Sequence, residues 1–480
     1  MESFDLLVIG GGINGAAIAR DAAGRGLSVL LVERDDLASH TSSASSKLAH
    51  GGLRYLEQYE FRLVRESLHE REVLLRNAPH IVRPLRFILP DPSGGRPWWL
   101  IRLGLLLYGV LAGRSSLKRP RAVGKGDRAV RDPLKGDFML AEYWDAWVDD
   151  ARLVVLNAMD AKLRGAEIAT RTELLSARRE GERWMAKLSG GREVSARMIV
   201  NAAGPWVAEV LHQRLGEDSR AGVRLVKGSH IVVPRLYEGD HAYILQQPDG
   251  RVVFALPYGE HSLIGTTDTP VQEPQDEAPE AAEIAYLCEA ANRYFVRQTS
   301  PGRVVWSFGG IRALYDDGAA DAKDVTRDYR LELDENGPKL LSVFGGKITT
   351  ARALALEAMD KLGVRGLKFT ATNHLPGGDL DIYFNEWMTE LARWMPEPML
   401  VRMAQAYGTR LRRVLEDAAS LDDLGRHFGA DLYEAEIRYL VDKEFAVTAE
   451  DIMWRRTKLG LRLSPKEQRE LGNFVASLLA

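Results

Sequence analysis

Residues 4–33 read FDLLVIGGGINGAAIARDAAGRGLSVLLVE, and this stretch decides the fold. Its first apolar run, Phe4–Ile9, predicts a short buried strand, and the alanine-rich run at about 16–23 predicts a helix that the following glycines end. A second apolar run, Ser28–Val32, predicts another strand, which is followed by Glu33. A strand, a helix and a strand in this order predict the first unit of an α/β, Rossmann-like domain.

The turn between the first strand and the helix carries the pattern G-x-G-x-x-G. Gly10 permits a tight turn, Gly12 lets the backbone approach a pyrophosphate, and Gly15 allows the helix to pack closely on the strand. The helix begins with free N–H groups directed at the phosphates, and Asn14 stands in its first turn. Glu33 follows where a carboxylate accepts a hydrogen bond from a ribose hydroxyl, which favours FAD or NAD over NADP. A purely structural glycine turn is the alternative.

Three later segments favour FAD over NAD, although each has an ordinary turn or surface loop as its alternative. A strand near 199–201 leads into small residues, which lets the backbone pass close to a flat cofactor. The turn FGGKITT at 344–350 directs a helix N-terminus toward the negative charge of a reduced flavin. The hydroxyl-rich run TSSASSK at 41–47 suits phosphate or ribose contacts. The residues expected at the cofactor in these segments are Thr41, Ser42, Ser45, Ser46, Lys47, Ala203, Gly204, Gly346 and Thr349.

The bulk composition is that of a globular protein with more than one domain. A chain of 480 residues is too long for one ordinary core, so two or three domains are expected. The one cysteine, Cys288, excludes an internal disulfide and fits a reducing compartment. Clustered Cys/His spacing is absent from the sequence, so no metal site is expected.

Charge and hydropathy single out one region. The run WWLIRLGLLLYGVLA at 98–112 is shorter than the roughly 20 residues needed to span a bilayer. The surrounding segment, 96–135, holds ten Lys and Arg residues against two acids. This pattern predicts either a helix lying on an anionic membrane face or a buried helix followed by a basic loop. No nucleic acid is expected as a partner, because the whole chain is slightly acidic and carries no reading motif.

Six motifs taken together resemble the aerobic, FAD-dependent glycerol-3-phosphate dehydrogenases of bacteria. They are GGGING at 10–15, TSSASSK at 41–47, HGGLRYLE at 50–57, KGSH at 227–230, GTTD at 265–268 and FGGKITT at 344–350. The likeness continues into the C-terminal region, with YEAEIRYLVD at 433–442 and WRRTK at 454–458. The glycine-rich motifs alone would indicate only the wider glycine-oxidase-like flavoprotein group. Within HGGLRYLE, Gly51 and Gly52 are expected at the cofactor.

The resemblance implies a module over 1–365 and a C-terminal α-helical cap domain over 376–480. The module combines a Rossmann-like FAD domain with a substrate domain that has a mixed or antiparallel sheet. We expect the FAD domain in segments of about 1–52, 149–210 and 304–362, and the substrate domain in segments of about 53–148 and 211–303. The resemblance further implies a quinone as electron acceptor and peripheral attachment to the cytoplasmic face of the inner membrane.

The implied reaction is the oxidation of sn-glycerol 3-phosphate to dihydroxyacetone phosphate, with FAD carrying the hydride chemistry. His230 is the favoured base, since an ordinary imidazole with a pKa of ~6.5 accepts a proton near neutral pH; a core histidine bonded to backbone is the alternative. Arg312 or Lys347 would instead polarise the alcohol oxygen and stabilise the alkoxide. These three are the expected catalytic residues.

Substrate binding needs an anchor for the phosphate. The planar fork of arginine matches phosphate geometry, and Arg54, Arg312 and Arg327 stand in segments like the family's active-site motifs. Tyr55 and Thr267 are expected to form hydrogen bonds with glycerol oxygens. One departure is Ala313, where the family pattern suggests proline; it should loosen that turn without removing the arginine.

Several alternatives stay open at this stage. An oxidase that uses O2 would share the flavin half-reaction, and rapid peroxide formation without quinone would favour it. A flavin-fold binding protein without turnover would not need Arg54, His230, Arg312 and Lys347 together. An NAD-linked dehydrogenase would not need the turn at 344–350. A second copy of the chain, as a homodimer, is a further candidate partner.

Overall fold

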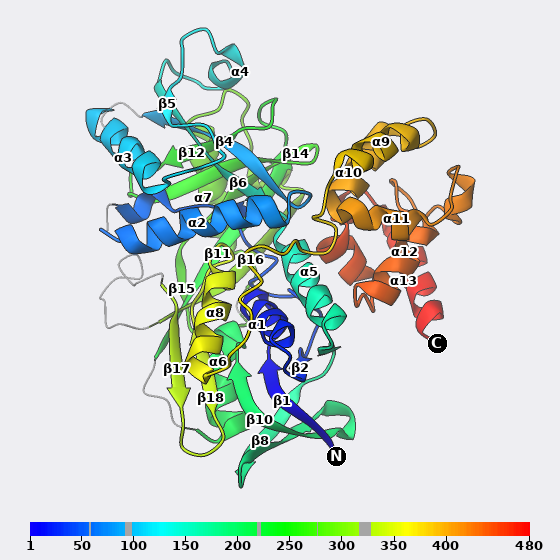
Figure 1. Ribbon diagram of the computed structural model, residues 1–480. Helices are drawn as coiled ribbons and strands as arrows, with labels where there is room; N and C mark the ends of the chain where they lie inside the picture. The colour runs from blue at the N-terminus through cyan, green and yellow to red at the C-terminus, as the bar shows by residue number, and fades with distance from the viewer. Residues whose placement is uncertain (57–58, 92–97, 218–221, 276, 316–327) are drawn as a thin grey trace.

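A computed structural model describes residues 1–56, 59–91, 98–217, 222–275, 277–315 and 328–480 (Figure 1). The described residues form two large β-sheets, helices that pack on both, and a separate group of helices at the C-terminus. In Figure 1 the first sheet lies below the second, and the C-terminal helices stand to one side. No helix in these ranges has the length and apolarity needed to cross a membrane.

The first sheet is mainly parallel and follows from the buried strands at the N-terminus. Along the sheet, the strands are β17 (Arg330–Asp334), β18 (Leu340–Phe344), β10 (Glu193–Asn201), β1 (Glu2–Ile9), β2 (Val29–Val32) and β7 (Glu167–Ala169), and the hairpin β8 (Leu174–Glu180) and β9 (Arg183–Leu188) continues from β10. The end of β1, Leu6–Ile9, is buried, as is typical of a strand covered on both faces. Three helices cover one face: α1 (Ile13–Gly24), α5 (Asp150–Leu163) and α8 (Ala351–Leu362).

The second sheet is mixed and mostly antiparallel. Its strands run in the order β15 (Thr269–Val271), β11 (Val223–Pro234), β14 (His261–Gly265), β13 (Val252–Tyr258), β12 (Ala242–Gln246), β4 (Val82–Asp91), β6 (Met139–Val148) and β3 (Leu48–Ala49), with β16 (Trp306–Tyr315) paired to β11 and β5 (Arg121–Ala122) paired to β6. Side chains of β11 alternate between two cores: Ile231 packs with α7 (Ala281–Asn292), and Val232 packs on the opposite side. That side is covered by α2 (Phe61–Asn77) and α3 (Trp98–Leu111). A short helix, α4 (Arg128–Arg131), follows.

The C-terminal region is helical, and its helices enclose a core of their own. The helices are α9 (Ile382–Leu391), α10 (Glu397–Tyr407), α11 (Leu411–Leu415), α12 (Glu434–Lys443) and α13 (Pro465–Leu479), with the short turns η8 (Asp451–Arg456) and η9 (Leu459–Leu461) between the last two. The last helix begins with a capping box in which Ser464 and Glu467 bond to each other's backbone N–H groups. The predicted fold class, a Rossmann-like flavoprotein with a mixed second sheet and a helical C-terminal domain, is confirmed.

Two details of the predicted segments differ from the observed sheets. Strand β16 had been placed with the FAD-domain segment 304–362, but it pairs along its whole length with β11 and so belongs to the second sheet. Helix α1 begins at Ile13, directly after the glycines, rather than at 16. The domain boundaries themselves stay a prediction.

Candidate active site

The glycine turn after β1 lines a cavity whose other walls come from both sheets. Gly10 adopts a φ of +105°, and a Cβ there would lie 2.6 Å from the backbone oxygen of Ala202. A Cβ at Gly15 would lie 1.9 Å from the oxygen of Gly10, so any side chain would push α1 off the strand. A Cβ at Gly12 would lie 3.1 Å from the hydroxyl of Ser42, so glycine avoids a tight contact between the turn and that serine. The turn thus brings α1 close to β1 and opens its N-terminus to a ligand.

Glu33 follows β2 and lines one end of the cavity. Its carboxylate accepts hydrogen bonds from the backbone N–H of Gly11 at 2.6 Å and of Asp35 at 2.8 Å. Burial raises the pKa of Glu33, while these two N–H groups favour its charged form. The side chain is therefore fixed in place at the spot where the sequence pattern puts a ribose.

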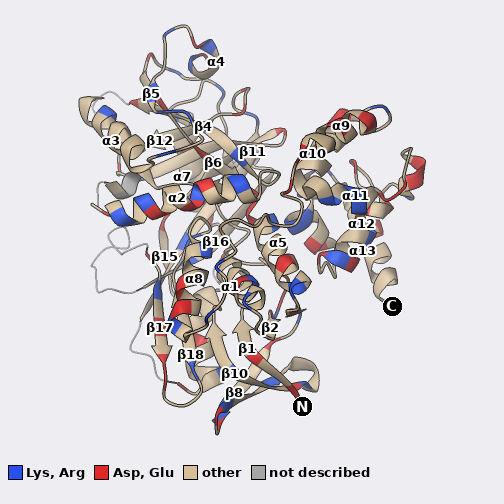
Figure 2. Cartoon of the chain, viewed as in Figure 1, with Lys and Arg blue, Asp and Glu red and all other residues tan. Residues whose placement is uncertain are grey.

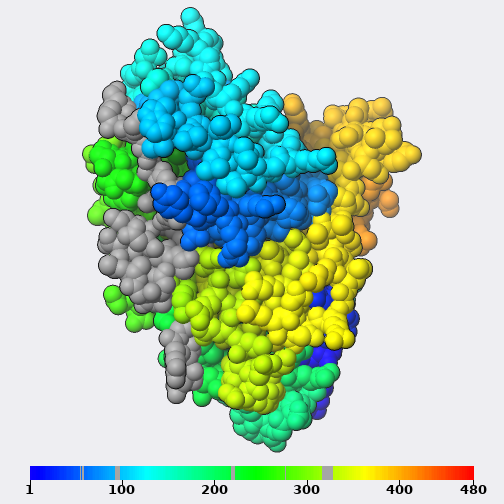
Figure 3. Space-filling view, turned by 60° about the vertical axis from the view of Figure 1, so that its left-hand side comes forward, coloured from blue at the N-terminus to red at the C-terminus, as the bar shows by residue number. Residues whose placement is uncertain are grey.

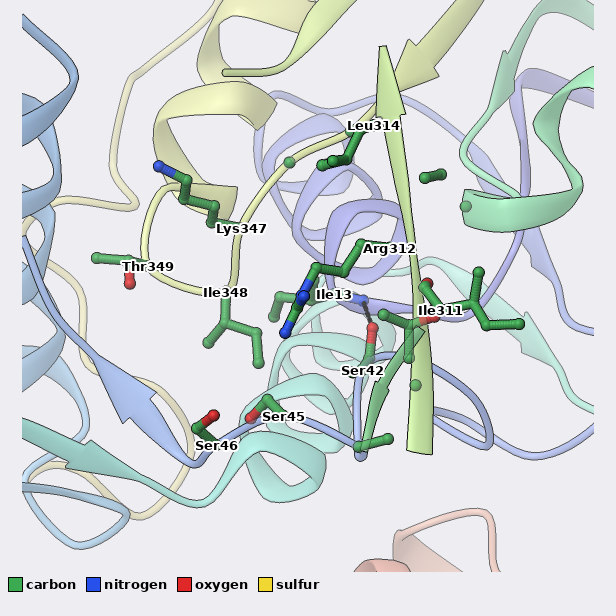
Figure 4. A pocket seen from close by; sticks show the side chains of 18 of the residues that line it. Ile13, Ser42, Ser45, Ser46, Ile311, Arg312, Leu314, Lys347, Ile348 and Thr349 are labelled. Atoms are coloured by element: carbon green, nitrogen blue, oxygen red, sulfur yellow. Dashed lines mark hydrogen bonds between the residues drawn. The ribbon is translucent and has the colours of Figure 1, made fainter. Parts of the chain in front are cut away.

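The hydroxyl-rich run 41–47 forms a second wall. Ser42 accepts a hydrogen bond from the N–H of Ile13 at 3.0 Å, which attaches the run to the start of α1 (Figure 4). Thr41 donates to the oxygen of Ile311 at 2.6 Å, which attaches it to the second sheet. The hydroxyl side chains of the run that line the cavity are Thr41, Ser42, Ser45 and Ser46, and Ala44 lines it beside them.

Lys47 lies inside the protein and does not line the cavity, although a phosphate or ribose contact was expected of it. Its ammonium group is 2.6 Å from a carboxylate oxygen of Asp150, at the start of α5, and both side chains are almost fully buried. Burial lowers the pKa of Lys47, and Asp150 opposes that effect. Ser45 donates to the same carboxylate at 2.7 Å. Lys47 therefore fastens the run to α5.

His230, on β11, faces the cavity from the opposite wall. Its Nε2 lies 2.9 Å from the hydroxyl of Ser46, and its ring stacks on that of Phe308 with centroids 4.9 Å apart. Burial, and then the charges of Lys47 and Arg312, hold the pKa of His230 well below its ordinary value of 6.5. The imidazole is therefore neutral at pH 7, which leaves a ring nitrogen with a lone pair, and burial makes it a weaker base than an exposed histidine.

Arg312, on β16, reaches into the cavity beside it (Figure 4). Its guanidinium forms an ion pair with Asp268 and donates to the hydroxyl of Thr266 at 3.2 Å. Gly228 makes room for this side chain, since a Cβ there would lie 2.5 Å from a guanidinium nitrogen. Asp268 and Thr266 also line the cavity. They come from the motif GTTD, which sequence reasoning quoted without giving these two residues a role.

The turn after β18 closes the remaining side. Asn14 donates from its side-chain amide to the oxygen of Gly345 at 3.1 Å, so the first and last glycine turns are in contact. A Cβ at Gly346 would meet that amide at 2.7 Å. Lys347 and Thr349 line the cavity from this turn. In Figure 4 the amino end of Lys347 points away from Arg312 and Ser46.

Other expected site residues lie elsewhere. Thr267 is buried outside the cavity lining; it accepts a bond from the N–H of Ser229 at 2.9 Å and donates to Glu283 at 2.8 Å. Gly51 donates to the hydroxyl of Tyr108 at 2.9 Å, whereas Gly52 lines the cavity. The side chains of Arg54 and Tyr55, and the whole of Arg327, lie outside the described residues.

Sequence reasoning did not assign Trp206, which lines the cavity near Glu33. The guanidinium of Arg34 lies 4.2 Å from the centre of its ring, and the ring of His40 lies 4.6 Å away. The strand that leads into small residues near 203 was the available signal, because Trp206 follows them directly. It adds a flat surface beside the expected ribose position.

All of these walls enclose one cavity of about 820 Å³, within the usual range of roughly 300–1,000 Å³ for ligand sites. One end is polar and holds the glycines, the hydroxyls and Glu33. The other end is apolar and extends to α3. Its lining there comprises Leu53, Leu56, Leu100, Leu103, Gly104 and Leu107.

Comparisons with known proteins agree with this geometry. Residues 5–352 match the family model described as FAD dependent oxidoreductase, and residues 369–480 match the C-terminal domain of alpha-glycerophosphate oxidase. The chain belongs to the FAD-dependent oxidoreductase family. The expected cofactor, FAD, is thereby confirmed.

Individual members of this family cover nearly the whole chain. The chain is 50% identical to a glycerol-3-phosphate dehydrogenase of Pseudomonas aeruginosa, over 99% of this chain and 96% of that protein. It is also 50% identical to a D-erythritol 1-phosphate dehydrogenase of Brucella abortus, over 97% of this chain and 96% of that one. The solved structure of a Bacillus halodurans glycerol-3-phosphate dehydrogenase with FAD shares the fold, with a TM-score of 0.75, 25% identity, and coverage of 99% and 94%. The resemblance given by the motifs is confirmed.

The residues of this FAD-dependent oxidoreductase fit its cofactor. Gly12 and the N-terminus of α1 would hold the pyrophosphate, and Glu33 a ribose of the adenosine half. The 346–349 turn and the small residues near 203 would border the isoalloxazine ring. These assignments agree with the lack of space for a Cβ at Gly10 and Gly346.

Proposed function

We propose that this protein oxidises sn-glycerol 3-phosphate to dihydroxyacetone phosphate. The observation that carries the proposal is the pairing of a cation, Arg312, with a neutral imidazole, His230, on neighbouring strands that face one cavity. A phosphorylated alcohol needs both, a guanidinium for its anionic group and a base for its hydroxyl proton. The names of relatives at 50% identity support the same substrate.

The chain's own residues would orient the alcohol and take its proton. Bound FAD supplies the acceptor for the hydride that leaves the alcohol carbon. Ser46 would pass the hydroxyl proton to Nε2 of His230, since its hydroxyl lines the cavity and lies 2.9 Å from that nitrogen. Arg312 would hold the phosphate or the developing alkoxide, with Asp268 fixing the direction of its guanidinium. Lys347 would add positive charge at the flavin edge of the cavity.

A second candidate substrate is D-erythritol 1-phosphate, because a dehydrogenase of that name is as similar to this chain as the glycerol-3-phosphate enzyme is. Both compounds present a phosphate and a secondary alcohol, so the same cation and base would serve either. Anaerobic mixing with each compound separates them. We expect glycerol 3-phosphate to bleach the flavin absorption band at lower concentration; faster and tighter reduction by erythritol 1-phosphate would assign the protein to the second substrate.

We further propose that a membrane quinone, rather than O2, reoxidises the flavin. The apolar end of the cavity supports this, because it is lined by α3, and the outward face of α3 is itself apolar and exposed. Trp99, Leu106 and Val110 are 66%, 64% and 66% exposed, respectively. A quinone with an apolar tail would therefore meet an apolar path from a membrane surface to the flavin.

The surroundings of α3 suit attachment to an anionic membrane on the cytoplasmic side. Figure 2 shows α3 as an almost uncharged helix beside the charged α2, and Figure 3 shows the residues of both helices on one face of the molecule. Exposed cations lie within and after the helix: Arg102 is in α3, and Arg114, Lys118, Arg119 and Lys125 follow it in the chain. Cations beside an apolar face strengthen binding to anionic lipid.

The acceptor is tested with the reduced protein. Turnover with a soluble ubiquinone analogue should exceed turnover with air-saturated buffer, and little peroxide should form. Peroxide formed at a rate equal to turnover, with no gain from the quinone, would assign the protein to the oxidases.

A further inference from the structure

One segment of the C-terminal domain, the WRRTK run at 454–458, lies against the wall that carries His230. It comprises the end of η8 and the residues that lead into η9. Arg455 and Arg456 both pair with the buried carboxylate of Asp36, at 2.6 and 2.8 Å. Asp36 stands three residues after Glu33, so the segment is anchored to the cofactor domain itself.

An aromatic column runs from this segment to His230. Trp454 stacks on Trp306, with ring centroids 4.5 Å apart and planes 22° apart. Trp306 contacts Phe308 at 4.7 Å, and Phe308 stacks on His230 at 4.9 Å with planes 10° apart. Trp306 and Phe308 point to the same side of β16, because they are two residues apart on one strand. The column therefore joins the C-terminal domain to the imidazole through ring contacts alone.

The position of Trp454 is tightly defined. A Cβ at Gly460 would lie 2.6 Å from two atoms of the Trp454 ring, so glycine at that position leaves the space that the indole fills. Trp454 packs against the core of the C-terminal domain, and its ring also stacks on Trp306 of the second sheet. Packing of the C-terminal domain alone does not explain this contact.

A polar route runs parallel to the column. Lys458 places its ammonium group 2.8 Å from Asp149 and 3.9 Å from Asp150. Asp150 binds Lys47 at 2.6 Å and Ser45 at 2.7 Å. Lys47 directly follows Ser46, whose hydroxyl bonds to Nε2 of His230, and directly precedes Leu48 of β3. Its ammonium group also lies 5.0 Å from the centre of the Phe308 ring, where the two routes meet.

We infer that Trp454 and Lys458 are positioning residues for the oxidation, which set the ring plane of His230 and the hydroxyl of Ser46 from the C-terminal domain. Trp454 fixes the ring through Trp306 and Phe308, and Lys458 fixes the hydroxyl through the paired aspartates. Neither side chain lines the cavity. The inference rests on the proposed function, in which His230 accepts the hydroxyl proton.

Loss of Trp454 should hydrate the imidazole. Without the indole, Trp306 and Phe308 lose their outer support, the column loosens, and water reaches a ring that is now 1% exposed. Hydration favours the charged imidazolium and so raises its pKa toward ~6.5. The rate of flavin reduction falls at low pH, where His230 becomes protonated, and this acid limb of the pH profile should move up by about one pH unit. At any fixed pH within the limb, reduction should then be about tenfold slower.

The test uses the FAD-loaded full chain and two readouts. The first is the rate of flavin reduction by sn-glycerol 3-phosphate between pH 5 and 9. The second is the titration of His230 followed by NMR with labelled histidine, assigned with His230→Asn, which needs no turnover. The variants are Trp454→Ala and Trp454→Phe, with Gly460→Ala to displace the indole without removing it. Trp387→Ala is the control, because Trp387 packs inside the C-terminal domain against Phe384 and Arg412.

We expect Trp454→Ala and Gly460→Ala to raise the pKa of His230 and, with it, the pH below which the flavin-reduction rate falls. Trp454→Phe and Trp387→Ala should stay close to the wild type in both quantities. Lys458→Met should lower the limiting rate at pH 8 without changing the substrate concentration at half-saturation. The inference is overturned if Trp454→Ala and Gly460→Ala retain FAD and titrate like the wild type, or if Trp387→Ala shifts His230 equally. If glycerol 3-phosphate does not reduce the flavin of the wild type, the proposed function is overturned instead. The NMR titration then still shows whether Trp454 affects the pKa of His230.

Discussion

Gly10→Ala should weaken FAD binding, and the structure gives the size of the effect. Alanine would pay for a φ of +105°, which costs roughly 1–2 kcal/mol. Its Cβ would also lie 2.6 Å from the oxygen of Ala202. That contact is between two backbones held together by the bond from the N–H of Ala202 to Ile9, so neither side can move without losing a hydrogen bond of about 0.5–1.5 kcal/mol. The two costs together come to about 1.5–3.5 kcal/mol.

Gly26→Ala is the matched control. Gly26 also has a positive φ, +89°, but a Cβ there would meet nothing within 4 Å. It should therefore lose only the roughly 1–2 kcal/mol of backbone strain and keep its flavin. Urea unfolding of the apo-proteins measures the stabilities, and absorbance after gel filtration measures bound FAD. We expect at least about a tenfold loss of FAD affinity in Gly10→Ala, equivalent to 1.4 kcal/mol. Equal FAD binding by the two variants would refute the cofactor position.

Three further predictions concern the reaction and the surface. Because burial holds the pKa of His230 below 6.5, flavin reduction should keep its full rate from pH 8 down to about 6.5 and fall only below that, as stopped-flow absorbance would show; a fall that begins above pH 7 would exclude His230 as the base. Arg312→Ala should lower kcat/KM for glycerol 3-phosphate by about 100-fold or more while FAD content stays unchanged, with partial recovery in Arg312→Lys; near-normal kinetics would remove Arg312 from the site. The pair Leu106→Glu and Val110→Glu, outside the cavity lining, should reduce co-sedimentation with phosphatidylglycerol vesicles at least tenfold without slowing reduction, since each apolar side chain contributes about 1.5–3 kcal/mol when buried; unchanged sedimentation would exclude α3 as the membrane contact.

The cofactor half of the site could be predicted from the sequence because its determinants are local. The glycine pattern, the helix and Glu33 lie within one βαβ unit, and the geometry of that unit follows from backbone requirements. The turns at 10–15 and 344–350 are in contact through Asn14 and Gly345, which are 331 residues apart in the chain. Both turns could still be recognised, because each carries the glycines that a flat ligand requires. Glycine motifs of this kind predict the local backbone conformation directly.

The substrate half was less accessible to sequence reasoning because its side chains are defined by distant partners. Thr267 was expected at a glycerol oxygen but donates to Glu283 outside the cavity lining. The same limit applies to Lys47 in the cofactor half, which was expected at a phosphate or ribose but pairs with a carboxylate 103 residues away. Asp268 gains its role only when β16 brings Arg312 beside it. The apolar run that forms α3 was likewise recognisable in the sequence, but its place in the cavity lining was not.

The central claim is that the cavity between the two sheets holds FAD and oxidises glycerol 3-phosphate there. The direct measurement is the visible spectrum of the purified, FAD-loaded protein under anaerobic conditions, before and after addition of sn-glycerol 3-phosphate. The account predicts loss of the oxidised flavin band and formation of one dihydroxyacetone phosphate per flavin. An unchanged spectrum with FAD bound, at millimolar substrate and neutral pH, would contradict it.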